Sequence, residues 1–382
     1  MRCLVAWLLT ATILTATPMW AAEPAGDPSR LTLPPRAFAV TGSETGVYFD
    51  NVVLTQDPAR YRFVVHSDLG TADGLKWVTT PTEKDVGDHA WRIEVFEGDK
   101  KVSEKAMTFT VVPAEAASGK RLRLLIVGDS LTHASLYPND LAKRLSAAGQ
   151  PTWTMLGTHK PGGAAEGVAH EGYGGWTWER FVTHYEPAPD LAARKHSSPF
   201  VFLTDDKPKL DVARYIREAC GGEAPDVVFF LLGINDCFGA KADDLAATDK
   251  RIDYVFGQAD KLVAAFREAC PKADLAVGIT TPGNIRESSF LDNYKGSYTR
   301  WGWKRIQHRL VERELQTFGG RESERLFLVP MELNLDPVAG YPDNNSVHPN
   351  AEGYRQVAAS LHAWLVARLG GVIPGGEVPA GK

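Results

Sequence analysis

The sequence predicts an α/β domain in which helices cover both faces of a parallel sheet, preceded by a small antiparallel β-sandwich. From Leu122 onward, apolar runs of strand length alternate with longer amphipathic stretches, the pattern of a three-layer α/β/α domain. Between Arg30 and Pro113, short alternating runs are separated by Gly, Asp and Pro turns. A chain of 382 residues also exceeds the usual size of one hydrophobic core, which favours two domains.

The first 22 residues predict a secretory signal peptide. An apolar stretch reaches Met19 and ends in two alanines, and it is short for a membrane helix. We therefore expect residues 1–22 to be removed, giving a secreted or periplasmic protein without stable membrane insertion. The position three residues before the cleavage site holds Met19 or Trp20 instead of a small residue, so an uncleaved anchor stays as the alternative.

The predicted sandwich spans residues 30–113, in runs such as "RYRFVVHS", "HAWRIEVFEG" and "AMTFTVVP". The small, polar segment that follows, "PAEAASGKR", predicts a linker over residues 114–121.

The α/β domain is expected over residues 122–371, with a flexible tail at 372–382. Its apolar runs predict strands at 122–127, 151–156, 226–232, 274–280 and 325–330. Its amphipathic stretches predict helices at 138–148, 207–219, 244–268, 299–318 and 351–369. The stretches from Trp176 to Asp206 and from Pro282 to Arg300 are longer than this scheme requires. They follow the carboxyl ends of strands, where open parallel sheets bind ligands, so we expect them to build a substrate cleft.

Charge and cysteine content limit the partners and the covalent links. A formal net charge of −5 without charge runs argues against a nucleic-acid partner, whose phosphates require a basic face. Cys220 and Cys270 each close a predicted helix just before a strand, so a disulfide between them is one prediction and two half-buried thiols are the other. In the first case Cys237 is the free thiol.

Four short segments place reactive groups at strand ends. "RLLIVGDSL" puts Ser130 directly after a buried strand, and "DVVFFLLGIND" ends a second strand near Asn235. "HEGYGGWTW" supplies Gly175, where a backbone N–H can approach a ligand closely, and "NSVHPNAEGYRQVA" puts His348 before the last helix. A serine, a histidine and two hydrogen-bond donors at one sheet edge favour nucleophilic attack with stabilisation of an oxyanion.

In their order and spacing, these four segments resemble the sequence blocks of the SGNH (GDSL-like) hydrolase superfamily, over Leu122 to about Leu369. The resemblance implies a flavodoxin-like fold and ester hydrolysis through an acyl-enzyme. Ser130 would be the nucleophile and His348 its general base, and Gly175 and Asn235 would hold the oxyanion. The N-terminal segment similarly resembles accessory β-domains of bacterial carbohydrate esterases.

One position departs from the superfamily pattern. An Asp usually stands three residues before the histidine, whereas this chain has Asn345 there and Asp343 as its nearest preceding carboxylate. An Asn in place of the triad Asp of a serine protease lowered turnover by about 10⁴ through the wrong His tautomer. Asp343, a backbone carbonyl and Asn345 are therefore the three candidates for orienting His348.

The remaining patterns are weaker. His159, Glu166, His170 and Glu171 lack the spacing of zinc motifs, so we expect neither a metal nor another cofactor. Several aromatic residues in or beside the two insertions either stack on sugars or pack the insertions: Trp176, Trp178, Tyr185, Phe200, Tyr294 and Tyr298.

The sequence thus predicts an exported serine esterase that removes acyl groups, chiefly acetyl, from a saccharide. A lipase, arylesterase or thioesterase acting on small acyl esters is the enzymatic alternative. A non-catalytic carbohydrate-binding protein with the same fold is the alternative of another class.

Overall fold

The computed structural model describes residues 26–190 and 195–374. The predicted signal peptide at 1–22 lies outside these ranges, as does most of the predicted tail at 372–382. None of the helices within the described ranges is both long and apolar enough to cross a bilayer.

A parallel sheet forms the centre of the second half of the chain, as predicted. Its main strands follow the order β11-β10-β15-β16-β17, and the short β12 pairs with the end of β10. In sequence numbering this is 2-1-3-4-5, the flavodoxin-like order. The strands are β10 (Arg121–Gly128), β11 (Thr152–Leu156), β12 (Glu171–Gly172), β15 (Val227–Leu231), β16 (Asp274–Gly278) and β17 (Leu326–Val329).

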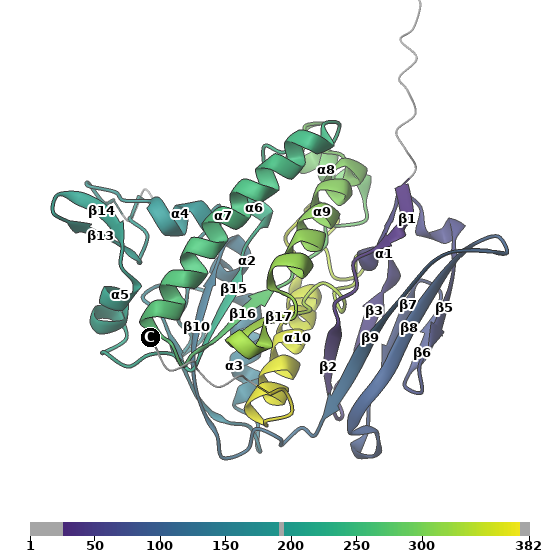
Figure 1. Ribbon diagram of the computed structural model, residues 1–382, viewed down its shortest axis with the longest axis horizontal. Helices are drawn as coiled ribbons and strands as arrows, with labels where there is room; N and C mark the ends of the chain where they lie inside the picture. Colours follow the sequence, from purple (N-terminus) through teal and green to yellow (C-terminus); the bar gives the residue numbers. More distant parts are fainter. Residues whose placement is uncertain (1–25, 191–194, 375–382) are drawn as a thin grey trace, which may run out of the picture.

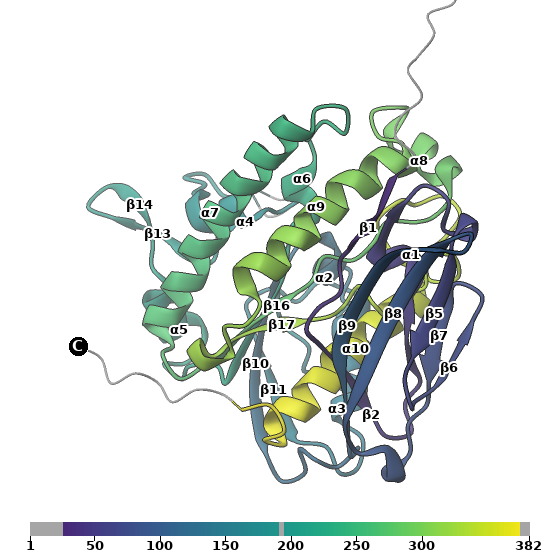
Figure 2. The ribbon, with the colours of Figure 1, turned by 45° about the vertical axis from the view of Figure 1, so that its right-hand side comes forward.

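Helices cover both faces of this sheet (Figures 1 and 2). On one face α3 (Leu136–Leu145) packs against α10 (Ala351–Leu369), and on the other α7 (Leu245–Ala269) packs against α9 (Arg300–Phe318). The shorter helices are α1 (Phe49–Val52) in the N-terminal region, α2 (Ser130–His133), α4 (Trp178–Thr183), α5 (Val212–Ala219), α6 (Ile234–Cys237) and α8 (Glu287–Tyr294). Single 3₁₀ turns occupy Pro58–Arg60, Glu83–Asp85 and Glu322–Glu324.

The predicted helix at 207–219 begins later than expected. Residues Lys207–Leu210 instead form β14, which pairs antiparallel with β13 (Val201–Thr204). Asp205 and Asp206 join these strands with φ of 51° and 60°. Two consecutive residues in the left-handed conformation suit a tight hairpin turn. The first four residues that were predicted as helix therefore form the second strand of a hairpin.

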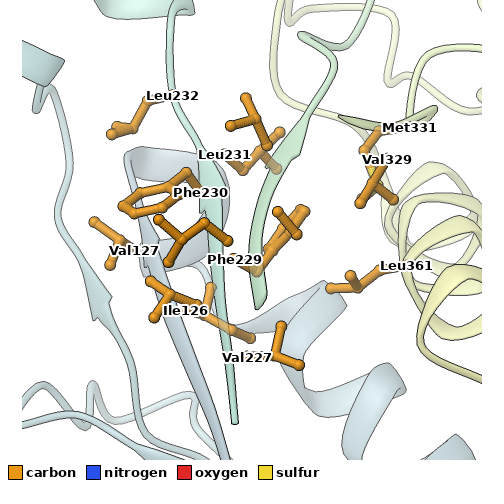
Figure 3. Close-up of a cluster of buried hydrophobic side chains, with 14 of the residues drawn as sticks. Ile126, Val127, Val227, Phe229, Phe230, Leu231, Leu232, Val329, Met331 and Leu361 are labelled. Atoms are coloured by element: carbon orange, nitrogen blue, oxygen red, sulfur yellow. The ribbon is translucent and has the colours of Figure 1, made fainter. Parts of the chain in front are cut away.

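The core between the layers explains why the strands could be recognised from sequence. Ile126, Val127, Phe229 and Phe230 are fully buried on neighbouring strands, and Leu361 of α10 approaches from the helical layer (Figure 3). Strands that are covered on both faces are apolar at nearly every position, which gives the continuous runs seen in the sequence.

The N-terminal region contains two larger sheets and one strand pair. The sheets have the orders β2-β9-β8-β5 and β3-β7-β6, and β1 pairs with β4. Trp77 of β7 packs against Trp91 of β8 and Phe109 of β9, so the two larger sheets face each other. The strands are β1 (Gly26–Leu31), β2 (Arg36–Val40), β3 (Thr45–Tyr48), β4 (Val53–Thr55), β5 (Arg62–His66), β6 (Thr71–Asp73), β7 (Lys76–Thr79), β8 (Gly87–Glu97) and β9 (Lys100–Val112).

This region is not purely antiparallel, in contrast to the prediction. Strand β2 pairs with β9 in parallel over Arg36–Val40 and Thr108–Val112. Parallel neighbours need a long connection between them, and residues 41–99 supply it.

The N-terminal region packs on the α/β region beside α10 and α9 (Figure 2). The Asn51 side chain donates to the carbonyl oxygens of Glu332 and Leu335, both at 2.7 Å. Residues 113–120 connect β9 to β10, and Ala117 within this connection is fully buried. The segment predicted as a linker is therefore anchored at Ala117, while Ser118, Gly119 and Lys120 are exposed.

The predicted disulfide between Cys220 and Cys270 is absent. Cys220, Cys237 and Cys270 are all free and buried. Cys220 and Cys270 end α5 and α7 and face the core, where burial raises the pKa of each to about 11. They are protonated thiols, the second of the two interpretations that the sequence allowed.

Candidate active site

Ser130 stands at the carboxyl edge of the sheet because a strand, a turn and a helix meet there. Strand β10 ends at Gly128, and the Asp129 side chain caps α2 by accepting the Leu131 N–H at 2.9 Å. A Cβ atom on Gly128 would lie 2.0 Å from Oγ1 of Thr132, so the close approach of helix to strand requires glycine. Ser130 is then the first residue of α2.

His348 contacts Ser130, although it comes from the C-terminal part of the α/β region in sequence. It lies just before α10, whose first turn is capped by the Asn350 side chain accepting from Glu352 N–H and Gly353 N–H. His348 Nε2 lies 2.8 Å from Ser130 Oγ, although 218 residues separate the two in sequence. This is the geometry of a serine hydroxyl beside a general base.

Asn345 orients His348. Its Oδ1 accepts the backbone N–H of His348 at 2.9 Å and that of Val347 at 3.2 Å. Because backbone N–H groups only donate, the atom facing them must be the amide oxygen. The same oxygen lies 3.1 Å from His348 Nδ1, so Nδ1 carries the proton and Nε2 is left to accept from Ser130.

The structure corrects the expectation that Asp343 orients His348. The Asp343 side chain is 90% exposed and forms an ion pair with Arg286, whose Nε lies 3.2 Å from Asp343 Oδ1. Of the three candidates, Asn345 is the one in contact. The tautomer problem of an Asn does not arise here, because two backbone donors prevent the amide from turning its nitrogen toward the histidine.

The insertion before α9 holds the loop that carries Asn345. Asn284 donates through Nδ2 to the carbonyl oxygens of Pro342 and Asn345, at 2.8 and 2.9 Å. Asn293 accepts the Ser346 N–H at 2.8 Å. Sequence reasoning missed Asn284 and Asn293, and the unusual length of this insertion was the one available signal.

Of the predicted oxyanion donors, Asn235 contacts Asp129 and Trp176, the chain neighbours of Ser130 and Gly175. The N–H groups of Ser130 and Gly175 have no hydrogen-bond acceptor within residues 26–190 and 195–374. Gly175 has φ of +76°, a conformation that favours glycine. Asn235 is present, but its Nδ2 donates to Asp129 Oδ2 at 3.3 Å and to the Trp176 carbonyl at 3.1 Å. The amide must therefore share or release a bond to reach an oxyanion.

Burial sets the protonation of the site. It raises the pKa of Asp129 to about 7, and it lowers the pKa of His348 below the ordinary histidine value. No carboxylate of the described residues opposes this effect at His348, where the neutral Asn345 lies beside Nδ1. The imidazole is therefore neutral near pH 7 and available as a base.

We expect Asn345→Asp to move the acid limb of the kcat/KM profile to higher pH. The limb reports the histidine pKa of the free enzyme, and a carboxylate beside Nδ1 stabilises the imidazolium and raises that pKa. Asn345→Ala removes the Nδ1 acceptor and is expected to lower kcat on the order of 10²–10⁴. Both effects are measured by steady-state hydrolysis of a p-nitrophenyl ester across pH 4–9.

Asp343→Ala is the matched control, since it removes a carboxylate from the same loop. Its profile should superimpose on that of the wild type. A shift with Asp343→Ala and none with Asn345→Asp would assign the orienting role to Asp343 after all.

A pocket of about 880 Å³ is lined by residues from the segments that carry Ser130 and Gly175, but Ser130 and His348 are not among its described lining residues. His133 of its wall lies in the same short helix as Ser130, and Gly174 precedes Gly175. His159 and His196 come from two further segments. Although histidines gather here, no group of three His, Cys, Asp or Glu in the described residues could hold a metal ion.

The aromatic residues in or beside the two insertions differ in how deeply they are buried. Trp178 and Phe200 belong to the hydrophobic core, which supports packing for these two. Trp176 is also buried, and its ring stacks on His196 at 5.0 Å. Tyr185, Tyr294 and Tyr298 are half-buried, and sugar stacking by them stays a prediction.

Comparison with known proteins gives likenesses among solved structures alone, since no family model and no curated protein matches the chain. A family two carbohydrate esterase from Clostridium thermocellum, in complex with cellohexaose, is 14% identical over 87% of this chain and 94% of its own, with a TM-score of 0.36. The carbohydrate acetylesterase Est24 of Sinorhizobium meliloti is 16% identical over 65% and 99%, with a TM-score of 0.36. The M. smegmatis aryl esterase is 15% identical over 64% and 98%, with a TM-score of 0.37.

These three likenesses are all below 20% in identity and below 0.5 in TM-score. The chemistry of this site follows from its own residues, independently of these likenesses.

Proposed function

We propose that the protein is an exported serine esterase that hydrolyses O-acyl, chiefly O-acetyl, esters of saccharides. The observation that carries the proposal is the contact of 2.8 Å between Ser130 Oγ and His348 Nε2, with Nδ1 held by Asn345. Export rests on the sequence pattern of residues 1–22.

The reaction proceeds in two halves. Ser130 Oγ attacks the ester carbonyl while His348 Nε2 takes its proton, and the imidazolium then protonates the leaving alcohol. Water attacks the acyl-serine with the same histidine as base, which releases the acid and restores Ser130. The free N–H groups of Ser130 and Gly175, joined by the Asn235 amide, stabilise the oxyanion in both halves.

The pocket wall supports a short acyl group and a polar substrate. No Leu, Ile, Val or Met occurs among its described lining residues, which include three histidines, an arginine and a threonine beside two prolines and the rings of Tyr173 and Trp176. A long acyl chain would need a broad aliphatic wall. This composition favours a saccharide ester over the lipid substrates of the alternative reading.

Covalent trapping tests the proposal directly. Wild-type protein should release acetate from acetylated sugars and p-nitrophenol from short aryl esters. A fluorophosphonate should stop both reactions and add one phosphonyl group, found by mass spectrometry on the peptide that contains Ser130.

Ser118→Ala, at an exposed position of the connection to β10, should be labelled like the wild type, and unfolded protein should not be labelled. Hydrolysis that persists after full labelling, or labelling at another residue, would refute the mechanism. Saccharide binding without hydrolysis of any ester would support the non-catalytic alternative.

A further inference from the structure

The pocket that His133 and Gly174 line holds a positive charge that the described protein does not neutralise. Arg180 of α4 lines it, with its guanidinium 4.9 Å from the centre of the Trp176 ring. The polar contact of the guanidinium is His184, whose Nε2 lies 3.4 Å from Arg180 Nη2. Arg180 Nε is buried and has no hydrogen-bond partner.

Several other half-buried arginines have carboxylate partners, whereas Arg267 donates to three backbone carbonyl oxygens. Arg300 pairs with Asp50, Arg309 with Asp249, and Arg368 with Asp274. Partly desolvated cations are normally paired in this way, because the loss of hydration must be offset. Arg180 lacks such a carboxylate among the described residues, and the described lining of its pocket contains no Asp or Glu.

The surroundings fix the guanidinium in place. The Trp176 ring contacts both the Arg180 guanidinium and the His196 ring. The planes of Trp176 and His196 differ by 11°. The indole is 2% exposed, so it serves to position these groups and leaves little surface for a sugar. A fixed guanidinium beside an open pocket is a suitable counter-ion for a planar or tetrahedral oxyanion.

The neighbouring imidazoles suit the same ligand. Burial, together with the nearby His133 and His196, lowers the pKa of His159 to about 4, so this ring is neutral near pH 7. His196 Nδ1 lies 3.0 Å from the Ser197 carbonyl oxygen and donates to it. These rings offer polar contacts without a negative charge that would oppose an anion.

We propose that this pocket is a subsite for an anionic group of the substrate, a carboxylate or a sulfate on the acylated saccharide, with Arg180 as its counter-ion. The proposal rests on the esterase function proposed above and narrows its substrate class to acidic saccharides. Because His133 and Gly174 belong to the segments that carry Ser130 and Gly175, we expect the charged group on the acylated residue or its neighbour.

Paired substrates test the subsite by turnover. Acetate release is measured from an acetylated methyl glucuronoside, an acetylated sulfated methyl glucoside and the neutral acetylated methyl glucoside. The wild type should have a higher kcat/KM for an anionic member of the set. Arg180→Gln should lower the anionic-to-neutral ratio of kcat/KM by about tenfold to a hundredfold, the size of a charge-assisted hydrogen bond.

Two further variants separate charge from packing. Arg180→Lys should retain part of the ratio, because it keeps the charge and loses the fork of donors. Arg214→Gln is the matched control, since Arg214 similarly lies 4.5 Å from the centre of the Phe202 ring but on another helix. It should keep the wild-type ratio. The larger of the two anionic rates identifies carboxylate or sulfate as the ligand.

A binding measurement distinguishes the two proposals from each other. Calorimetry on Ser130→Ala protein should detect glucuronate or a sulfated glucoside, and Arg180→Gln in that background should weaken binding by the same factor. If this binding is found but the wild type hydrolyses no ester, the subsite proposal is supported and the esterase proposal is refuted. Hydrolysis with a ratio near one, unchanged by Arg180→Gln, would overturn the subsite and leave the esterase standing.

Discussion

Ser130→Ala is expected to lower kcat for ester hydrolysis by about 10⁶, the scale seen when a hydrolase loses its nucleophile or its base. The hydroxyl oxygen is the atom that lies 2.8 Å from His348 Nε2. Without it no acyl-enzyme forms, and the oxyanion donors retain only a residual effect on attack by water. Acetate release under saturating substrate measures the loss, with thermal unfolding as a check on folding.

The double variant gives the sharper result. His348→Ala alone should cause a loss of similar size, and adding it to Ser130→Ala should cause almost no further loss, because the two side chains act as one unit. Ser118→Ala should behave as the wild type. If the loss of kcat in the double variant equals the product of the two single losses, Ser130 and His348 act independently and the mechanism is wrong.

Asp50→Ala is expected to cause the largest loss of stability, about 3–5 kcal/mol. Asp50 of α1 stands between Arg300 and Lys304 of α9, and all three side chains are between 10% and 12% exposed. Arg300 Nη2 lies 3.1 and 3.2 Å from the two carboxylate oxygens. Burial lowers the pKa of Lys304 and Asp50 opposes this, so Asp50→Ala leaves two shielded cations with backbone carbonyl contacts but without this carboxylate.

Thermal unfolding of the full chain measures this effect. A loss of 3 kcal/mol corresponds to a midpoint lower by roughly 6–12 °C in domains of 150–250 residues. Asp50→Asn, which keeps the shape and an acceptor, should show a smaller shift. Glu218→Ala removes the partner of Arg214 in an exposed pair and should change stability by only about 0–1 kcal/mol. Equal shifts for Asp50→Ala and Glu218→Ala would disprove that the ion-pair cluster holds the N-terminal region on α9.

Local chemistry made much of the fold predictable. The five main strands lie within two residues of their predicted ends, because a strand buried on both faces must be apolar throughout. The hairpin at 201–210 was not predicted. Its turn residues Asp205 and Asp206 end the segment that was expected to build the cleft, and its second strand was assigned to the following helix. The parallel pairing of β2 with β9 also escaped prediction, because alternation identifies a strand and says nothing of its partner's direction.

The sequence by itself determined the positions of Ser130 and His348, because each follows from a strand end or a helix start that neighbouring residues specify. Only the tertiary structure decided between Asp343 and Asn345. That choice depends on a loop held by Asn284 and Asn293, which lie 61 and 53 residues before the residues that they contact. The lack of a carboxylate partner for Arg180 among residues 26–190 and 195–374 is likewise a tertiary property, since it becomes visible only in the folded chain.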